Sequence, residues 1–142
     1  SILLIGGKGP ELKNLKDLSK SLNIEKKVKF LGFIPENEIF DLYAIADLFV
    51  SIDWADYRIT MYESLAMNTK VLLSNETDSD KFLLKSKYLF VTQPDSKSTA
   101  KALELALNEK PNIEYSELKE YLRSFTWYSY CKKIAKILFQ DK

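Results

Sequence analysis

Glu63 is the residue whose type and position best suit chemistry. It lies in the segment ITMYESLAM (59–67), where apolar residues surround it at helical spacing. A glutamate is seldom tolerated on so apolar a helix without a partner. One turn inside the helix, its carboxylate can reach a group docked at the N-terminus, where free N–H groups favour an anion. A nucleotide, with phosphate and vicinal hydroxyls, would use both features; the alternative is an ordinary solvated helix position.

A second candidate is the loop GGKGP (6–10), in which Gly7 and Gly9 would let the backbone approach a phosphate or a base closely. The loop is not a Walker loop, because no GK[ST] follows. Pro10 also separates it from the Rossmann dinucleotide fingerprint. In a turn between a strand and a helix, glycines are needed for the backbone conformation alone at least as often as for contact with a ligand. By itself, this loop therefore does not identify a ligand.

Short apolar runs alternate with helical patterns along the chain. They predict strands at residues 2–5, 28–31, 48–51, 71–74 and 88–91, and helices at 12–22, 35–47, 59–67, 80–84, 96–107, 116–123 and 127–139. This alternation predicts an α/β fold with a parallel sheet covered by helices on both faces. Ligands bind beyond the carboxyl ends of such strands, so the loops at 6–10, 32–35, 52–58 and 75–80 are the places to expect a site.

The composition excludes several kinds of site. The chain has 142 residues, enough for one domain, and its net charge of +1 gives no general attraction to nucleic acid. It contains no histidine, which excludes imidazole metal sites and Ser-His pairs. Its one cysteine, Cys131, is expected to be a buried filler, and a reducing compartment is the default. No apolar run approaches the ~20 residues of a transmembrane helix. The opening SILLIGG looks like a strand of a longer protein rather than a signal peptide.

The order of motifs resembles the donor-binding domain of GT-B glycosyltransferases, in the retaining group that includes glycogen synthases and many mannosyl- and glucosyltransferases. The segments that carry the resemblance are, in chain order, LLIGGKGPELKNL (3–15), VKFLGFIP (28–35), LYAIADLFV (42–50), YESLAMN (62–68) and FTW (125–127). They cover nearly all of the chain. YESLAMN is similar to the family's "l-E-A-m-A-x-G" element, with Asn68 in the place of its glycine.

The resemblance implies roles for particular residues. Glu63 matches the second glutamate of the family's E-x7-E motif, which binds the ribose hydroxyls of the nucleotide. Backbone atoms of Phe33 and Ile34 would meet the base, and Gly7 and Gly9 would allow close approach. The turn before the helix would offer N–H groups to the diphosphate and the sugar, through Asp56, Tyr57, Arg58, Ile59 and Thr60.

Two departures from the family pattern bear on activity. Ala55 stands in the place of the motif's first glutamate, and Asp56-Tyr57-Arg58 in the place of its Gly-Phe-Gly. Asp56 could replace the carboxylate with a shift of one residue and Arg58 could bind phosphate, or the contact with the donor sugar is lost. The family's preceding strand and helix, which hold an arginine and a lysine for the diphosphate, and its acceptor-binding domain also have no counterpart here.

The resemblance implies a single Rossmann-like, doubly wound domain over residues 1–142, truncated at its N-terminus, with a helical C-terminus. Deleting the family's first strand from its order 3-2-1-4-5-6 gives five strands in the order 2-1-3-4-5. The implied function is transfer of a glycosyl group, with retention, from a nucleoside-diphosphate sugar. The alternatives are a sugar-nucleotide epimerase of the same fold and a non-catalytic nucleotide-binding module.

The resemblance also implies partners. They are the nucleotide sugar, an N-terminal acceptor-binding domain of the same protein, and a glycan or lipid-linked acceptor; no metal, cofactor or nucleic acid is expected. The expected location is cytoplasmic, or peripheral at the inner membrane face. The isolated fragment is expected to be inactive. The identity of the sugar and the nucleotide stays open.

Overall fold

The computed structural model describes residues 1–52, 59–76 and 80–139. The chain forms two compact units, Ser1–Asp41 and Leu42–Lys142, which are described separately below. Asp56, Tyr57 and Arg58 lie outside the described residues.

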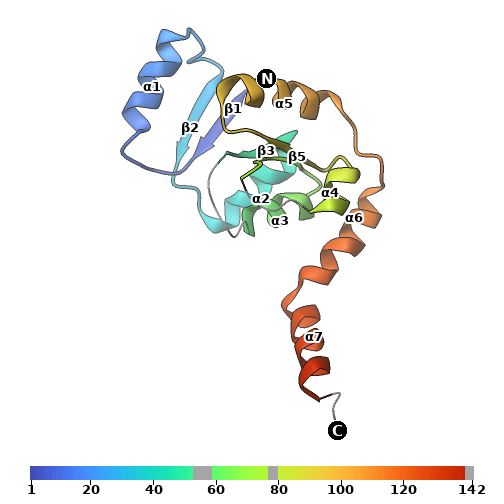
Figure 1. Cartoon of the computed structure of the whole chain (residues 1–142). Coiled ribbons are helices and arrows are strands. Elements are labelled where there is room, and N and C mark those ends of the chain that lie inside the picture. Colours follow the sequence, from blue (N-terminus) through green and yellow to red (C-terminus); the bar gives the residue numbers. More distant parts are fainter. Residues whose placement is uncertain (53–58, 77–79, 140–142) are drawn as a thin grey trace. The chain divides into compact units, whose positions relative to one another are not determined.

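The first unit is a β-α-β arrangement. Strands β1 (Leu3–Gly6) and β2 (Val28–Gly32) pair in parallel and are joined by helix α1 (Leu12–Ser21), as Figure 1 shows. At the carboxyl ends of the two strands the Gly7 N–H donates to the Gly32 carbonyl at 2.6 Å. Gly7 (φ 105°) and Gly32 (φ 71°) both have positive φ angles, which glycine adopts without steric cost. These two glycines therefore let the chain turn away from the sheet.

The first unit buries little apolar surface. The only described residues in it that are buried are Val28 and Ser19. The leucines whose spacing predicts α1 do share one face of that helix, yet Leu15, Leu18 and Leu22 remain more than two-fifths exposed. Leu3 and Leu4 of β1 are also exposed. A two-stranded sheet under one helix is too small to cover these residues.

The second unit holds a three-stranded parallel sheet in the order β3-β4-β5, with the strands in regular register. Its elements are the end of α2 (Glu36–Ile45), β3 (Leu48–Ser51), α3 (Ile59–Ala66), β4 (Lys70–Ser74), α4 (Lys81–Lys85), β5 (Leu89–Thr92), α5 (Ser96–Asn108), α6 (Tyr115–Leu122), the 3-10 helix η1 (Arg123–Phe125) and α7 (Trp127–Phe139).

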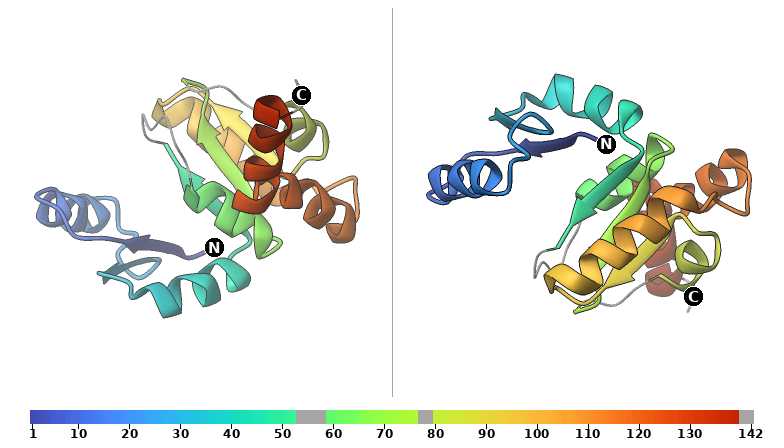
Figure 2. Two further views of the ribbon diagram at one scale, coloured as in Figure 1. Left: turned by 90° about the horizontal axis from the view of Figure 1, so that it is seen from below. Right: turned by 90° about the horizontal axis from the view of Figure 1, so that it is seen from above.

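The core of this unit lies on both faces of the central strand β4. Its residues Val71 to Ser74 are all buried, as expected for a strand between two layers of helices. Helices α3 and α5 lie on opposite faces of the sheet (Figure 2). On the α3 face the buried cluster comprises Met61, Leu65, Val71, Leu73, Leu83, Tyr88, Leu89 and Leu118. Helix α5 turns Ala102, Leu103 and Ala106 inward at helical spacing.

The predicted fold class is confirmed, since parallel strands lie between helices and the C-terminus is helical. The predicted strand order is present in two pieces, β2-β1 and β3-β4-β5. One detail differs: β1 and β3, neighbours in the predicted order, belong to separate sheets. In the order implied by the family, the strand between them is the deleted one, so these two strands are not natural hydrogen-bonding partners. The single domain at 1–142 stays a prediction.

Helix α3 ends in a turn that fixes its C-terminus. Asn68 has a φ of 67°, in the left-handed region, where asparagine is tolerated better than most residues with a side chain. Its N–H donates to the Leu65 carbonyl at 3.0 Å, and its side-chain oxygen accepts a 2.7 Å hydrogen bond from the Tyr88 hydroxyl. The Tyr115 hydroxyl donates to the Ala66 carbonyl. The turn therefore connects the end of α3 to Tyr88, the residue before β5, and to α6.

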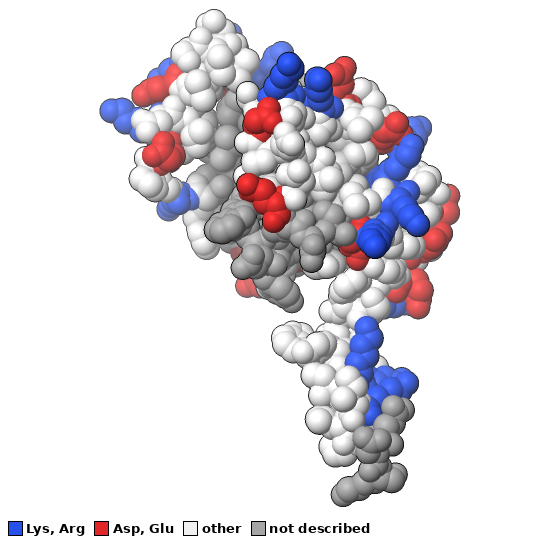
Figure 3. Space-filling view, viewed as in Figure 1, with Lys and Arg blue, Asp and Glu red and all other residues white. Residues whose placement is uncertain are grey.

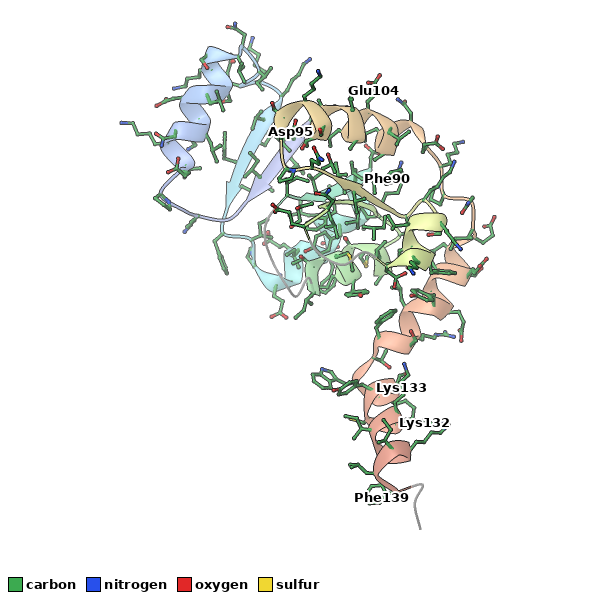
Figure 4. The ribbon with its side chains drawn as sticks, viewed as in Figure 1. Phe90, Asp95, Glu104, Lys132, Lys133 and Phe139 are labelled. Atoms are coloured by element: carbon green, nitrogen blue, oxygen red, sulfur yellow. The ribbon has the colours of Figure 1, made fainter. Side chains whose placement is uncertain are left out.

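Side-chain caps begin two of the helices. Asp80 accepts from the Leu83 N–H at 3.0 Å at the start of α4, and its other oxygen accepts from the Tyr121 hydroxyl at 2.5 Å. Burial, followed by the contact with Asp80, raises the pKa of Tyr121 to about 12. Asp95, labelled in Figure 4, caps α5 through the N–H groups of Lys97 and Ser98. Hydrogen bonds from Ser98 lower the pKa of the Asp95 carboxyl.

Helix α7 has the predicted bounds, and its apolar side chains are exposed. It contains no buried residue, and Trp127, Tyr128 and Phe139 are each at least 74% exposed. Cys131 is exposed, so its assignment as a buried filler is wrong. Helical periodicity shows which residues share a face, but it cannot say what covers that face. None of the helices in the described part of the chain is long and apolar enough to span a bilayer.

The turn after α3 gives a first prediction. Asn68→Gly keeps the left-handed conformation but loses the bond to Tyr88, so it should lower the free energy of unfolding by about 1 kcal/mol. Tyr88→Phe removes the same bond from the other side and serves as the matched control. Asn68→Ala loses the same bond and, unlike glycine, keeps a Cβ in the left-handed region, which alanine tolerates less well than asparagine, so it should cost about 2 kcal/mol or more. Urea unfolding measures all three, and an alanine variant as stable as the glycine variant would contradict this account.

The contact between Asp80 and Tyr121 gives a second prediction. Because the folded-state pKa of Tyr121 lies above its ordinary value of 10.0, its stabilising effect is complete below about pH 10 and is lost as the pH rises towards 12. Tyr121→Phe should therefore be less stable than the wild type near pH 8, by a margin that shrinks between about pH 10 and 12.

Chemical denaturation across that pH range tests the prediction. Tyr128→Phe, at a position 77% exposed, is the control, because it removes a tyrosine hydroxyl from a side chain that lies in solvent. A constant margin for Tyr121→Phe would show that the hydroxyl does not hold its proton more tightly in the folded state.

Candidate functional site

The candidate site lies in the second unit, where β3, β4 and β5 end. Parallel strands bring their carboxyl ends to one edge of the sheet, and the helices that follow begin there. Ser51, Ser74 and Thr92 are the last residues of the three strands. Ser74 is fully buried and interacts with Glu76 through its hydroxyl, which accepts from the Glu76 N–H at 3.2 Å. Of the helices that begin at this edge, α3 carries Glu63.

Glu63 lies in the second turn of α3 and is half-buried. Met61 and Leu65, one turn apart, fill the side of α3 that faces the core. Glu63 lies midway between them in sequence, so the helical repeat places it on the other side of α3. It is therefore not part of the core.

The Tyr43 hydroxyl, from the end of α2, is the group on which the Glu63 carboxylate acts electrostatically. Burial in the first place, and then the nearby Glu63 carboxylate, raise the pKa of the Tyr43 hydroxyl above its usual value. The phenol therefore keeps its proton. Sequence reasoning missed Tyr43, although it lies in the LYAIAD segment on which the resemblance rests. A buried tyrosine needs a partner for its hydroxyl, and that rule was the available signal.

Two other predicted residues lie close to Glu63 along the chain. Ile59 and Thr60 form the first turn of α3, and both are exposed. The first N–H groups of a helix lack partners within the helix, and no acidic side chain lies in this first turn. The start of α3 is therefore electrostatically suited to an anion.

The remaining described candidates belong to the first unit. Gly7 makes the turn after β1, and Gly9 has open space where a Cβ would lie. Phe33 is 71% exposed. The Ile34 side chain instead packs against Gly6, and it leaves no room for a Cβ at Gly6. The structure thus groups Gly7, Gly9, Phe33 and Ile34 in one unit and Glu63, Ile59 and Thr60 in the other.

Lys70 has a structural role. It lies at the start of β4, and its ammonium group donates to the carbonyls of Ala106 and Glu109, the latter at 2.9 Å, at the C-terminus of α5. Burial lowers the pKa of Lys70, while the charges of Asp47 and Glu109 oppose this effect. A cation at this position satisfies the last carbonyls of the helix. Lys70 is thus at the opposite end of β4 from the candidate site.

A hollow of ≈ 400 Å³ lies beside α5 and the end of β5. Its lining includes Asn75, Thr92, Gln93 and Lys101 but no residue of α3. Asp95 already occupies the N–H groups at the start of α5. This hollow is therefore separate from Glu63 and does not offer a free helix N-terminus. Among the described residues, no group of three or more acidic or cysteine side chains could hold a metal ion.

Known proteins similar to this chain are glycosyl-transferring enzymes. An alpha-monoglucosyldiacylglycerol synthase of Streptococcus pneumoniae is 37% identical over 71 residues, covering 49% of this chain and 16% of that protein. A mannosylfructose-phosphate synthase of Agrobacterium fabrum is 33% identical over 79 residues, covering 51% of this chain and 17% of its own length. The chain thus spans about a sixth of these relatives.

Solved structures show the same fold. The Anabaena protein Alr3699/HepE in complex with UDP superposes with a TM-score of 0.74 over 96% of this chain and 40% of its own, at 19% identity. WaaG, a glycosyltransferase involved in lipopolysaccharide biosynthesis, superposes with a TM-score of 0.71 over 97% of this chain and 38% of its own, at 20% identity, which confirms the predicted GT-B fold. Residues 1–125 match the family described as "Glycosyl transferases group 1". Because this match covers most of the 142 residues, the chain belongs to the group 1 glycosyl transferases.

Proposed function

We propose that this chain is the part of a glycosyltransferase that binds the nucleoside-diphosphate sugar. Family membership and a structural neighbour solved with UDP support this function. The observation that carries the proposal for the site is Glu63, a half-buried carboxylate one turn from the start of α3. The protein to which the chain belongs would supply the acceptor-binding domain.

Glu63 binds the ribose in this proposal. A carboxylate has about four lone-pair directions. The vicinal hydroxyls of a ribose are a matched pair of donors for them. The charge-assisted hydrogen bonds that result are among the stronger ones in proteins.

The diphosphate lies at the N-terminus of α3. The N–H groups of Ile59 and Thr60 would donate to it, with Asp56, Tyr57 and Arg58 on the approach to the helix. The resemblance assigns contact with the base to backbone atoms of Phe33 and Ile34, and close approach of the backbone to Gly7 and Gly9. Fixed donors at a helix N-terminus stabilise the negative charge of a departing nucleoside diphosphate, and such stabilisation can be a large part of catalysis.

Several finer features belong to the proposal as well. We propose a hexosyl transfer with retention, without a metal or cofactor, to a glycan or lipid-linked acceptor. One relative is, by its name, a glucosyldiacylglycerol synthase, which favours a lipid acceptor. A cytoplasmic setting agrees with the single cysteine, because a reducing compartment does not sustain disulfides.

A non-catalytic nucleotide-binding module is the second candidate, and one observation favours it. Ala55 and the triplet Asp56-Tyr57-Arg58 replace the glutamate and glycines that approach the donor sugar in the family pattern. Such a module would bind UDP or GDP but transfer no sugar from a nucleotide sugar in the full protein.

Replacement of Glu63 tests the nucleotide site. Glu63→Ala should weaken binding of the preferred nucleoside diphosphate by about one to two decades, because a charge-assisted hydrogen bond is worth roughly 1.5–3 kcal/mol. Glu63→Gln should weaken it less, since the amide oxygen still accepts. Titration calorimetry of the full protein with UDP and with GDP measures both effects.

Glu104→Ala is the matched control, because Glu104 is an exposed glutamate on α5 (Figure 4). Its affinity for the nucleotide should equal that of the wild type. If Glu63→Ala binds the nucleotide as tightly as Glu104→Ala does, Glu63 is an ordinary helix residue and the assignment fails.

A further inference from the structure

We propose that helix α7 (Trp127–Phe139) is a membrane-surface helix, which lies in the plane of a bilayer and binds anionic lipids. This surface belongs to a different helix from Glu63, so the inference goes beyond the proposed function and does not depend on the nucleotide site. A helix of 13 residues is about 20 Å long, which is too short to cross the ~30 Å hydrocarbon core of a bilayer. The helix therefore lies along the membrane surface.

The side chains of α7 divide into two faces. At 3.6 residues per turn, Lys132, Lys133 and Lys136 fall within little more than a quarter of the helix circumference, together with Ser129. Figure 3 shows the lysines on one side of α7 and uncharged side chains on the other. This division is typical of helices that lie in a membrane interface. The rest of the circumference carries only apolar or aromatic residues: Trp127, Tyr128, Tyr130, Cys131, Ile134, Ala135, Ile137, Leu138 and Phe139.

The apolar face of α7 is exposed. No residue of the helix is buried, and Trp127, Ile137 and Phe139 are each at least 74% exposed. The ring of Trp127 meets the ring of Tyr130 edge-on, with the centroids 5.9 Å apart, but both rings belong to α7 itself. Within the described part of the chain, nothing buries this face. Tryptophan and tyrosine are also the residues enriched at the level of the lipid headgroups.

The charge of this region indicates which partner fits the face. Residues 121–139 contain four basic residues and no acidic one, whereas the remaining 123 residues contain 17 basic and 20 acidic residues. Around the helix, Lys132 and Lys133 border the apolar face on its two sides. Both can extend their ammonium groups towards headgroups while the apolar side chains enter the boundary of the bilayer. Such a face complements a negatively charged lipid surface.

A protein partner is the alternative occupant of this face. It could be another part of the full protein, since the chain covers only 38% to 41% of solved structures similar to it, or a second copy of the chain. Lysine is depleted in protein interfaces, yet three of the 13 residues of α7 are lysines. The composition therefore favours a lipid surface, and a face covered by protein would keep the full protein off vesicles.

Co-sedimentation of the full protein with vesicles tests the proposal. The protein should bind vesicles of phosphatidylcholine mixed with anionic phosphatidylglycerol, and it should bind vesicles of phosphatidylcholine alone about tenfold or more weakly. Added salt should weaken the binding, because it screens the attraction. Full protein that stays in the supernatant with the anionic vesicles, or that binds both kinds of vesicle equally, would overturn the proposal.

Substitutions of lysines locate the binding on α7. The triple variant Lys132→Gln, Lys133→Gln, Lys136→Gln should bind the anionic vesicles about a hundredfold more weakly, because each lysine near such a surface contributes about fivefold. The matched control has the same net charge and should bind like the wild type. It replaces three exposed lysines of other segments by glutamine: Lys13, Lys26 and Lys97. If the two triple variants bind equally well, α7 is not the binding surface and the proposal fails.

Leu138→Ser tests whether the apolar face enters the bilayer. It should weaken binding to the anionic vesicles by about tenfold or more, since a leucine is no longer buried in the lipid. Leu107→Ser, at an exposed leucine of α5, is the control and should bind like the wild type. Because Leu138 is 67% exposed, its replacement should leave the unfolding transition unchanged. Equal binding by these two variants would show that α7 does not insert its apolar face, which contradicts the proposal.

Discussion

The packing of α3 on β4 is the contact on which the candidate site depends. Met61 and Leu65 meet Val71 and Leu73 in the buried cluster, and Leu65 and Val71 are completely inaccessible to solvent. Full burial of one such side chain contributes about 1.5–3 kcal/mol. Because two positions one turn apart are fixed against the sheet, the rotation of the helix is fixed. The direction of Glu63 follows from that rotation.

Hydrogen bonds fix the position of α3 along its axis, which the apolar packing leaves free. Apolar contacts are not directional, so they allow a helix to slide along its axis more easily than hydrogen bonds do. The bonds of Tyr88 to Asn68 and of Tyr115 to Ala66 hold the C-terminal end of α3. The start of the helix then lies at a defined height above the end of β3. The rotation of α3 and its position along its axis are thus both set by residues that have no contact with a ligand in the proposed mechanism.

Local patterns in the sequence predicted most of the elements. The strand at Leu48–Ser51 and the helix at Trp127–Phe139 have the predicted bounds, because hydrophobic periodicity and turn residues are local signals. The contacts that hold the second unit together are not local. Lys70 meets Ala106 across 36 residues of sequence, and the Thr69 hydroxyl bonds to the Tyr43 carbonyl across 26. A periodic pattern contains no information on such pairs, so sequence analysis identified Glu63 but missed Tyr43.

The exposed helix α7 has a consequence for local stability. Lysines gather on one side of it and uncharged residues on the other (Figure 3), and it buries no residue. Helices of this length are marginal in water without tertiary contacts, so α7 should exchange its amide protons far faster than β4. A large apolar surface is thus carried by one of the most weakly held helices of the chain. If α7 became ordered or melted, the binding properties of that surface would change. The sheet on which α3 and Glu63 rest would stay as it is.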